Sequence, residues 1–72
     1  MQLNTEALKA LRESGGDTQV SLASRAGISM QALNALEQGK SKPRPKTIQK
    51  LADALGVPVA AISYIDQHQA AS

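Results

Sequence analysis

Apolar residues recur along the 72-residue chain at intervals of three and four, and glycine or proline interrupts the pattern several times. This period predicts amphipathic helices, and the interruptions mark their ends. No alternation of apolar and polar residues is long enough to indicate a strand, and Leu3 can extend the first apolar stripe. The sequence therefore predicts an all-α fold, a compact bundle of five short helices over residues 5–14, 18–26, 29–38 and 45–55 and after Pro58.

The two central helices carry clear signals at their ends. Thr18 and Ser29 are placed to accept hydrogen bonds from free N–H groups in the first turns of the helices that follow them. Gly27 ends the first of these helices, where the chain must adopt a left-handed conformation that costs glycine nothing. Ala23 lies where two steeply crossing helices leave room for little more than a methyl group. This pattern is typical of a helix-turn-helix.

The residues in and after this motif resemble the lambda-repressor-like family of DNA-binding domains, also called the Cro/C1 or Xre type. The resemblance covers roughly residues 5–65 and rests on Gln19, Ala23, Gly27, Leu33, Leu36, the exit Glu37-Gln38-Gly39-Lys40 with Pro43, and the segment 50–57. It implies sequence-specific binding of double-stranded DNA by a transcriptional regulator, with a repressor favoured. In this family the second helix of the motif, near residues 29–38, reads the major groove.

The exposed face of that helix supplies the candidate base contacts. Leu33 and Leu36 are expected to face the core, so the opposite face presents Met30, Gln31, Asn34 and Ala35. Glutamine and asparagine amides match the N6/N7 edge of adenine, and methionine or alanine can contact a thymine methyl group. No lysine or arginine occurs between Ser29 and Gln38, so the commonest guanine contact cannot come from this helix. The alternative for the amides is an ordinary solvent-facing position.

A basic stretch follows the expected recognition helix. Between Glu37 and Asp53 the chain has five lysine and arginine residues and no acidic one, although the net charge is only +2. A basic stripe beside such a helix is typical of a polyanion partner, whereas alone it would indicate a solvated loop. A helix N-terminus also favours an anion. We therefore expect phosphate contacts from Thr18, Gln19, Ser29, Gln38, Lys40, Lys42 and Arg44.

Glu37 is unusual in a region expected to bind phosphate, and the resemblance offers an explanation. Family members often pair an acidic residue at this place with an arginine of the first helix, and Arg12 occupies the matching position. We expect Arg12 and Glu37 to form a structural ion pair rather than a DNA contact. Two departures from the family pattern, Ser21 in place of an acidic residue and Arg44 in place of serine or threonine, weaken local capping.

The end of the chain supplies the expected dimer surface. One recognition helix covers only a few base pairs, so helix-turn-helix proteins usually pair two copies across one turn of DNA. We expect a homodimer on a near-palindromic operator, with Tyr64 and Ile65 at its surface and an association that can be weak in free solution. The alternative is that Val59 and Ile62 only close the monomer core, which would leave Tyr64 and Ile65 exposed. The domain is expected to span residues 1–65, followed by a flexible tail over 66–72.

The composition narrows the function classes. The absence of cysteine excludes disulfides and thiolate zinc sites, and the only histidine, His68, lies in the polar tail. We expect no metal, no cofactor, no small-molecule ligand and no enzymatic activity. The chain has no cysteine nucleophile, no histidine outside the tail, no close carboxylate pair with an obvious cleft and no glycine-rich phosphate loop. No apolar run approaches the roughly 20 residues that cross a bilayer, so a cytoplasmic location is expected. The remaining alternative to DNA binding is a protein-interaction module, an adaptor or an antitoxin, on the same fold.

Overall fold

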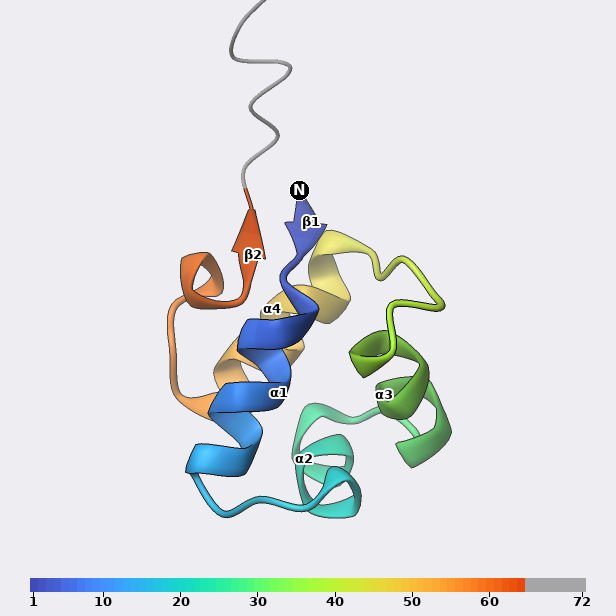
Figure 1. Cartoon of the computed structure of the whole chain (residues 1–72), viewed down its shortest axis with the longest axis vertical. Coiled ribbons are helices and arrows are strands. Elements are labelled where there is room, and N and C mark those ends of the chain that lie inside the picture. Colours follow the sequence, from blue (N-terminus) through green and yellow to red (C-terminus); the bar gives the residue numbers. More distant parts are fainter. Residues whose placement is uncertain (65–72) are drawn as a thin grey trace, which may run out of the picture.

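The computed structural model describes residues 1–64 and is mainly helical (Figure 1). The elements in chain order are β1 (Gln2–Leu3), α1 (Thr5–Ser14), α2 (Gln19–Ala26), α3 (Met30–Glu37), α4 (Pro45–Leu55), the 3-10 turn η1 (Val59–Ala61) and β2 (Ser63–Tyr64). The first four predicted helices are present, each within one residue of its expected bounds. The prediction of a mainly helical fold is confirmed, and the arrangement after α4 needs correction.

The fifth predicted helix is a single 3-10 turn, and the chain then forms a strand that the sequence analysis excluded. β2 pairs antiparallel with β1, with Leu3 opposite Ser63, so Leu3 does not extend α1. The Val59 carbonyl accepts from the Ile62 N–H at 3.0 Å and from the Ser63 hydroxyl at 2.7 Å, which closes the turn before a second can form. The Asn4 N–H donates to the Ile62 carbonyl at 2.8 Å. These bonds join the two ends of the domain. The β-branched Ile62 and the aromatic Tyr64 also favour an extended backbone at β2.

Side-chain caps begin the helices that surround the turn. The Thr18 hydroxyl accepts from the Ser21 N–H at 3.0 Å, and the Ser29 hydroxyl accepts from the Ala32 N–H at 3.0 Å. Between the two helices Gly27 adopts a φ of 74°, a left-handed conformation that other residues rarely reach. The caps and the glycine fix where α2 ends and where α3 starts, and thus the angle at which α3 leaves the core.

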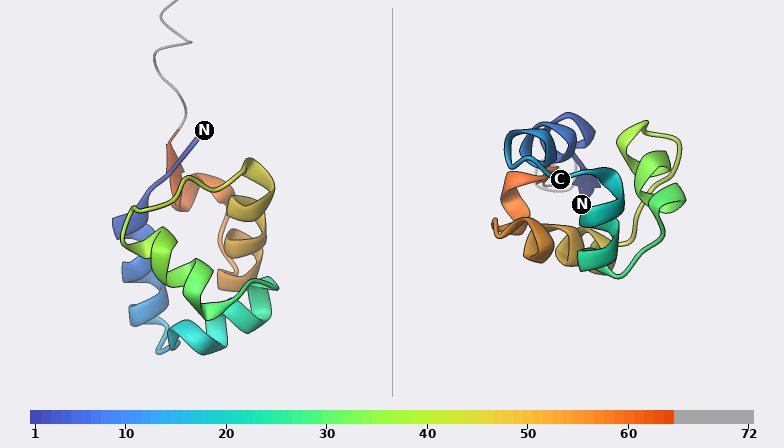
Figure 2. Two further views of the ribbon diagram at one scale, coloured as in Figure 1. Left: turned by 90° about the vertical axis from the view of Figure 1, so that its right-hand side faces the viewer. Right: turned by 90° about the horizontal axis from the view of Figure 1, so that it is seen from below.

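One apolar core joins all four α-helices and η1. Its buried members are Leu8, Leu22, Ala23, Ala26, Leu33, Leu36, Ile48, Leu51, Ala52 and Ile62. α2 packs against both α3 and α4, α1 packs against α3, and η1 packs against α4. Ala23 is only 2% exposed, in line with the close helix crossing expected for it. Figure 2 shows that this packing leaves α3 on the outside of the molecule, with α2 below it and the loop to α4 above it.

Candidate nucleic-acid interface

α3 presents its polar side to solvent. Met30 and Gln31 at its start are exposed, and Met30 is 44% exposed. Asn34 and Ala35 are half-buried one turn later, and Gln38 just after the helix is exposed. Leu33 and Leu36 are buried on the opposite side, as the spacing predicts. The predicted base-contact residues therefore share one side of α3, with Met30 and Gln31 the more accessible pair.

Free backbone donors lie at the starts of α2 and α3. The first N–H groups of a helix have no partner within the helix. The side-chain caps satisfy one N–H in each case, and the N–H groups of Gln19, Val20, Met30 and Gln31 have no hydrogen-bond partner among the described residues. These donors, together with the positive end of each helix dipole, suit an anion such as a phosphate.

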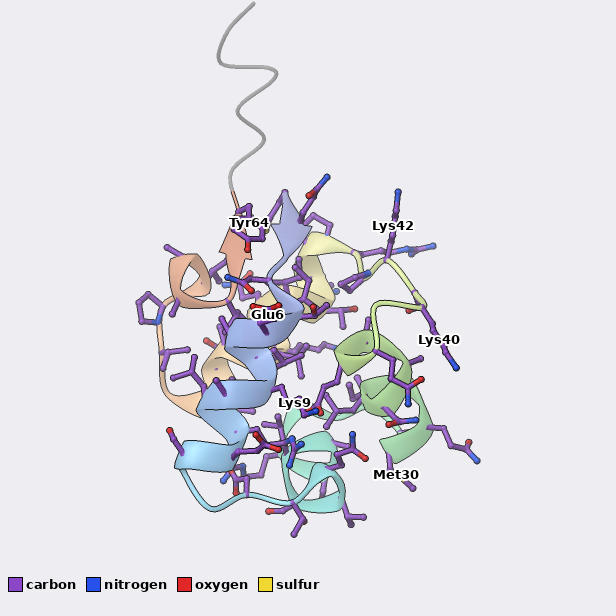
Figure 3. All side chains as sticks on the ribbon, in the orientation of Figure 1. Glu6, Lys9, Met30, Lys40, Lys42 and Tyr64 are labelled. Atoms are coloured by element: carbon purple, nitrogen blue, oxygen red, sulfur yellow. The ribbon has the colours of Figure 1, made fainter. Side chains whose placement is uncertain are left out.

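The loop between α3 and α4 carries the predicted cationic residues. Lys40, Lys42 and Arg44 are all exposed, and none forms an ion pair with another described residue. Figure 3 shows Lys40 and Lys42 extending from the same side of the molecule as Met30, with Lys40 just beyond the end of α3. Arg44 precedes α4 without a side-chain cap, as the sequence indicates. The positive charge of this loop is thus available to a partner.

Arg12 and Glu37 form an ion pair between α1 and the end of α3. The Arg12 Nε donates to Glu37 Oε2 at 2.6 Å, and Arg12 Nη2 donates to Glu37 Oε1 at 3.0 Å. The Arg12 side chain is 11% exposed and the Glu37 side chain 3%. Hydrogen bonding to Glu37 raises the pKa of the Arg12 guanidinium and outweighs the opposite effect of burial, so Arg12 remains charged at neutral pH. Arg12 Nη1 also donates to the Asp17 carbonyl at 3.0 Å.

A network of side-chain amides connects α2 to α3, and the sequence analysis did not anticipate it. Gln19 Nε2 donates to Asn34 Oδ1 at 3.2 Å and to Glu37 Oε1 at 3.1 Å. Gln38 Nε2 donates to the same Asn34 oxygen at 3.2 Å. The only signal in the sequence was the place of Gln19 at a helix N-terminus, which pointed to a phosphate contact instead. Gln19 and Asn34 are thus bound to each other within the protein.

Arg25 in the last turn of α2 and Asp17 just before α2 form a second ion pair, with Arg25 Nη2 and Asp17 Oδ2 2.6 Å apart. The Arg25 side chain is 47% exposed, so this pair contributes little to stability. It does reduce the free positive charge beside Thr18. The lysines and Arg44 after α3 are therefore stronger candidates for phosphate binding than Arg25.

The residues predicted for a dimer surface are only partly described. Tyr64 is 54% exposed at the end of β2, whereas Ile65 lies outside the described residues, as does the predicted tail. Ile62 is fully buried and Val59 is half-buried against the core. Val59 and Ile62 therefore close the core, and Tyr64 is the large apolar side chain that stays exposed between Pro58 and the end of the described residues.

Two further observations concern residues 1–64. They contain no group of three or more histidine, cysteine, aspartate or glutamate residues arranged to hold a metal ion. None of their helices is both long and apolar enough to cross a membrane.

Comparison with known proteins identifies the domain. A family model described as a helix-turn-helix, HTH_3, matches residues 8–62, from α1 through η1. The chain belongs to this family of helix-turn-helix DNA-binding domains. The resemblance noted in the sequence is thereby confirmed. The matching curated relatives are described as HTH-type transcriptional regulators, which agrees with the predicted function class.

Three relatives illustrate the similarity. The HTH-type transcriptional repressor RghR of Bacillus subtilis is 42% identical over 60 residues, which make up 82% of this chain and 44% of RghR. The structure of the restriction-modification controller protein C.AhdI from Aeromonas hydrophila has a TM-score of 0.78 at 28% identity, over 79% of this chain and 86% of C.AhdI. The P22 c2 repressor in complex with a synthetic operator has a TM-score of 0.73 at 25% identity, over 82% of this chain and 89% of that one.

The matching curated relatives are bacterial, and the HTH_3 domain described here spans only part of each. Its matched segment covers between 20% and 61% of their lengths.

Proposed function

We propose that this HTH_3 domain binds a specific double-stranded operator in the bacterial cytoplasm and acts as a transcriptional repressor. One observation carries the proposal: exposed Met30 at the start of α3 lies on the side of the molecule that also presents Lys40 and Lys42 (Figure 3). Gln31, next to Met30 in the chain, is exposed as well, and both motif helices begin with free N–H groups. RghR is described as a repressor and the P22 c2 repressor was solved on an operator, which supports the same function.

α3 is the proposed recognition helix. The Gln31 amide can donate to N7 and accept from the N6 amino group of one adenine, whereas Met30 and Ala35 can contact thymine methyl groups. Asn34 is half-buried, so it contributes less to base recognition than Gln31, and it does so through its free amino group. Because α3 lacks lysine and arginine, we expect the preferred operator half-site to be rich in A·T pairs where α3 contacts it.

Phosphate groups on either side of the groove are the proposed partners of the free N–H groups and of the basic loop. Contacts to phosphate fix the position of a protein on the duplex without reading its sequence. We propose the same phosphate-contact residues as the sequence predicts, except that Gln19 contributes its backbone N–H rather than its side chain. They are Thr18, Gln19, Ser29, Gln38, Lys40, Lys42 and Arg44.

Neutralising the basic loop will weaken binding to every DNA sequence by a similar factor. Lys40→Ala and Lys42→Ala should each reduce the slope of log affinity against log salt concentration by about one, since each removes one phosphate contact. Fluorescence titration of a random duplex at several salt concentrations measures this slope. Lys9→Ala is the matched control, because Lys9 is an exposed lysine on α1 (Figure 3). If wild type and both loop variants had equal slopes, or if Lys9→Ala reduced the slope as much as they do, Lys40 and Lys42 would not be phosphate contacts.

The proposal includes a homodimer on a near-palindromic operator. Two copies of α3 about 34–36 Å apart would enter successive major grooves on one face of the duplex. Tyr64 is exposed at the end of β2 and is the proposed contact within the described residues, next to Ile65. Because Tyr64 is the only large apolar side chain exposed after Pro58 within the described residues, we expect two copies to associate mainly on DNA.

The stoichiometry on DNA tests this part of the proposal. Native mass spectrometry of the wild-type protein on a selected duplex should show two copies, and Tyr64→Ala should lower the occupancy of the second position. Gln49→Ala is the control, because Gln49 on α4 is exposed and lies outside both the proposed dimer contact and the proposed DNA interface. A single copy bound with full specificity would rule out the dimer and leave DNA binding by the monomer intact.

A further inference from the structure

Recognition of adenine by a side-chain amide requires both of its functions. The amide oxygen must accept from the adenine N6 amino group while the amide nitrogen donates to N7. An amide nitrogen carries two hydrogens, and its oxygen has two lone pairs. The hydrogen bonds within the protein therefore decide which amides near α3 can still make this pair.

The Gln19 side chain has no donor left for DNA. Its two Nε2 hydrogens are engaged by Asn34 Oδ1 at 3.2 Å and by Glu37 Oε1 at 3.1 Å. Glu37 is held in place by Arg12 and is almost completely buried. The remaining atom, Gln19 Oε1, can only accept a hydrogen bond, and a phosphate oxygen can only accept as well. The side chain thus cannot bind phosphate while the network is intact.

Asn34 retains only its donor function. Its Oδ1 accepts from Gln19 Nε2 and from Gln38 Nε2, both at 3.2 Å, so both lone pairs are in use. Its free Nδ2 can donate to purine N7, guanine O6 or thymine O4, but the oxygen cannot accept from adenine N6. Asn34 therefore cannot distinguish adenine by a paired contact.

Gln31 differs from both. It is exposed near the start of α3, and its amide makes no hydrogen bond to any described residue. We propose that Gln31 alone makes the paired contact to adenine from α3, while Gln19 is a positioning residue that holds Asn34 as a donor-only group. This inference rests on the proposed function. It deepens that function because it names the Gln31 amide as the group that reads adenine and limits Asn34 to donating a hydrogen bond.

The first test separates a positioning role of Gln19 from a phosphate contact. Wild type, Gln19→Ala and the bulkier Gln19→Met are titrated with a random duplex and with a selected duplex at several salt concentrations. Gln49→Ala, which removes an exposed amide on α4, is the control. If Gln19 is a positioning residue, both Gln19 variants should keep the wild-type affinity and salt slope on random DNA. On the selected duplex they should lose affinity by at least about fivefold.

The outcomes of this first test are distinct. A uniform loss with the salt slope reduced by about one would show a phosphate contact and overturn the inference. Unchanged affinity on the selected duplex would overturn it as well. If the wild-type protein binds neither duplex, the proposed DNA-binding function itself fails. This result differs from those that overturn only the inference about Gln19. Circular dichroism confirms that each variant is folded, and Gln19→Met preserves most of the side-chain volume if Gln19→Ala is unstable.

The second test probes the adenine contact directly. Each adenine of the selected duplex is replaced in turn by an analogue without the N6 amino group. At one position the wild type and Asn34→Ala should both lose affinity, by roughly 5- to 140-fold, and Gln31→Ala should show no such loss. If removal of the N6 amino group no longer weakened binding by Asn34→Ala but still weakened binding by Gln31→Ala, the adenine contact would belong to Asn34. That result would overturn the inference.

Discussion

Replacing Glu37 with alanine will lower the free energy of unfolding by about 3–5 kcal/mol. The substitution leaves the Arg12 guanidinium, whose side chain is 11% exposed, without the carboxylate that accepts two of its hydrogen bonds. It also removes one acceptor of Gln19. A domain of this size has a total unfolding free energy of only roughly 4–11 kcal/mol, so the variant should be close to unfolding. Urea denaturation followed by circular dichroism measures the change.

The control for this prediction is Glu13→Ala. Glu13 also lies near Arg12, at 3.9 Å, but its side chain is 59% exposed. We expect its loss to change stability by no more than about 0.5 kcal/mol. A double variant, Arg12→Met with Glu37→Leu, should recover much of the lost stability, because no unpaired buried charge remains. Equal small effects of Glu37→Ala and Glu13→Ala would show that the pair does not stabilise the fold.

Replacing Gln31 with alanine will remove roughly 1–3 kcal/mol of binding free energy on the preferred operator and almost none on random DNA. The reason is that Gln31 is exposed on α3 and both functions of its amide are free to meet a base. Titration of both duplexes gives the two losses, and thermal unfolding should be unchanged because the side chain is exposed.

The matched control for Gln31 is Gln49→Ala, an exposed glutamine on α4 rather than on the recognition helix. It should leave both affinities unaltered. If Gln31→Ala weakened the two duplexes equally, Gln31 would be a contact to the DNA backbone, and specificity would have to come from other residues of α3.

The helices could be predicted because their ends are encoded locally. Thr18 and Ser29 cap helices through N–H groups three residues away, and Gly27 supplies the left-handed turn between them. Family resemblance pointed to Arg12 and Glu37, which the structure joins although they are 25 residues apart. Local chemistry and a familiar motif thus accounted for the helix-turn-helix and for its attachment to α1.

The β1–β2 pair could not be predicted, because its causes are not local. Each strand has two residues, too few for a visible alternation, and Leu3 pairs with Ser63 from the opposite end of the domain. The apolar residues after Pro58 fitted a helical stripe, but the hydrogen bonds of Val59 and Asn4 favour a turn and a strand instead.

The amide network was missed for a similar reason. Whether Gln19 meets Asn34 depends on the distance and angle between α2 and α3, which packing of Ala23 and its neighbours sets. Residue type alone indicated only that these amides are polar and lie near the surface. The roles assigned to them on DNA stay predictions.

The affinity of the wild-type protein for an operator selected from a random pool tests the central claim most directly. It is compared with a scrambled duplex of the same composition at about 50 mM and 200 mM salt. We predict that the selected duplex binds at least about 1,000-fold more tightly than the scrambled one and that both affinities fall steeply at the higher salt concentration. Failure to select any sequence, together with no salt-sensitive binding to either duplex, would contradict DNA recognition and favour a protein-interaction module on this fold.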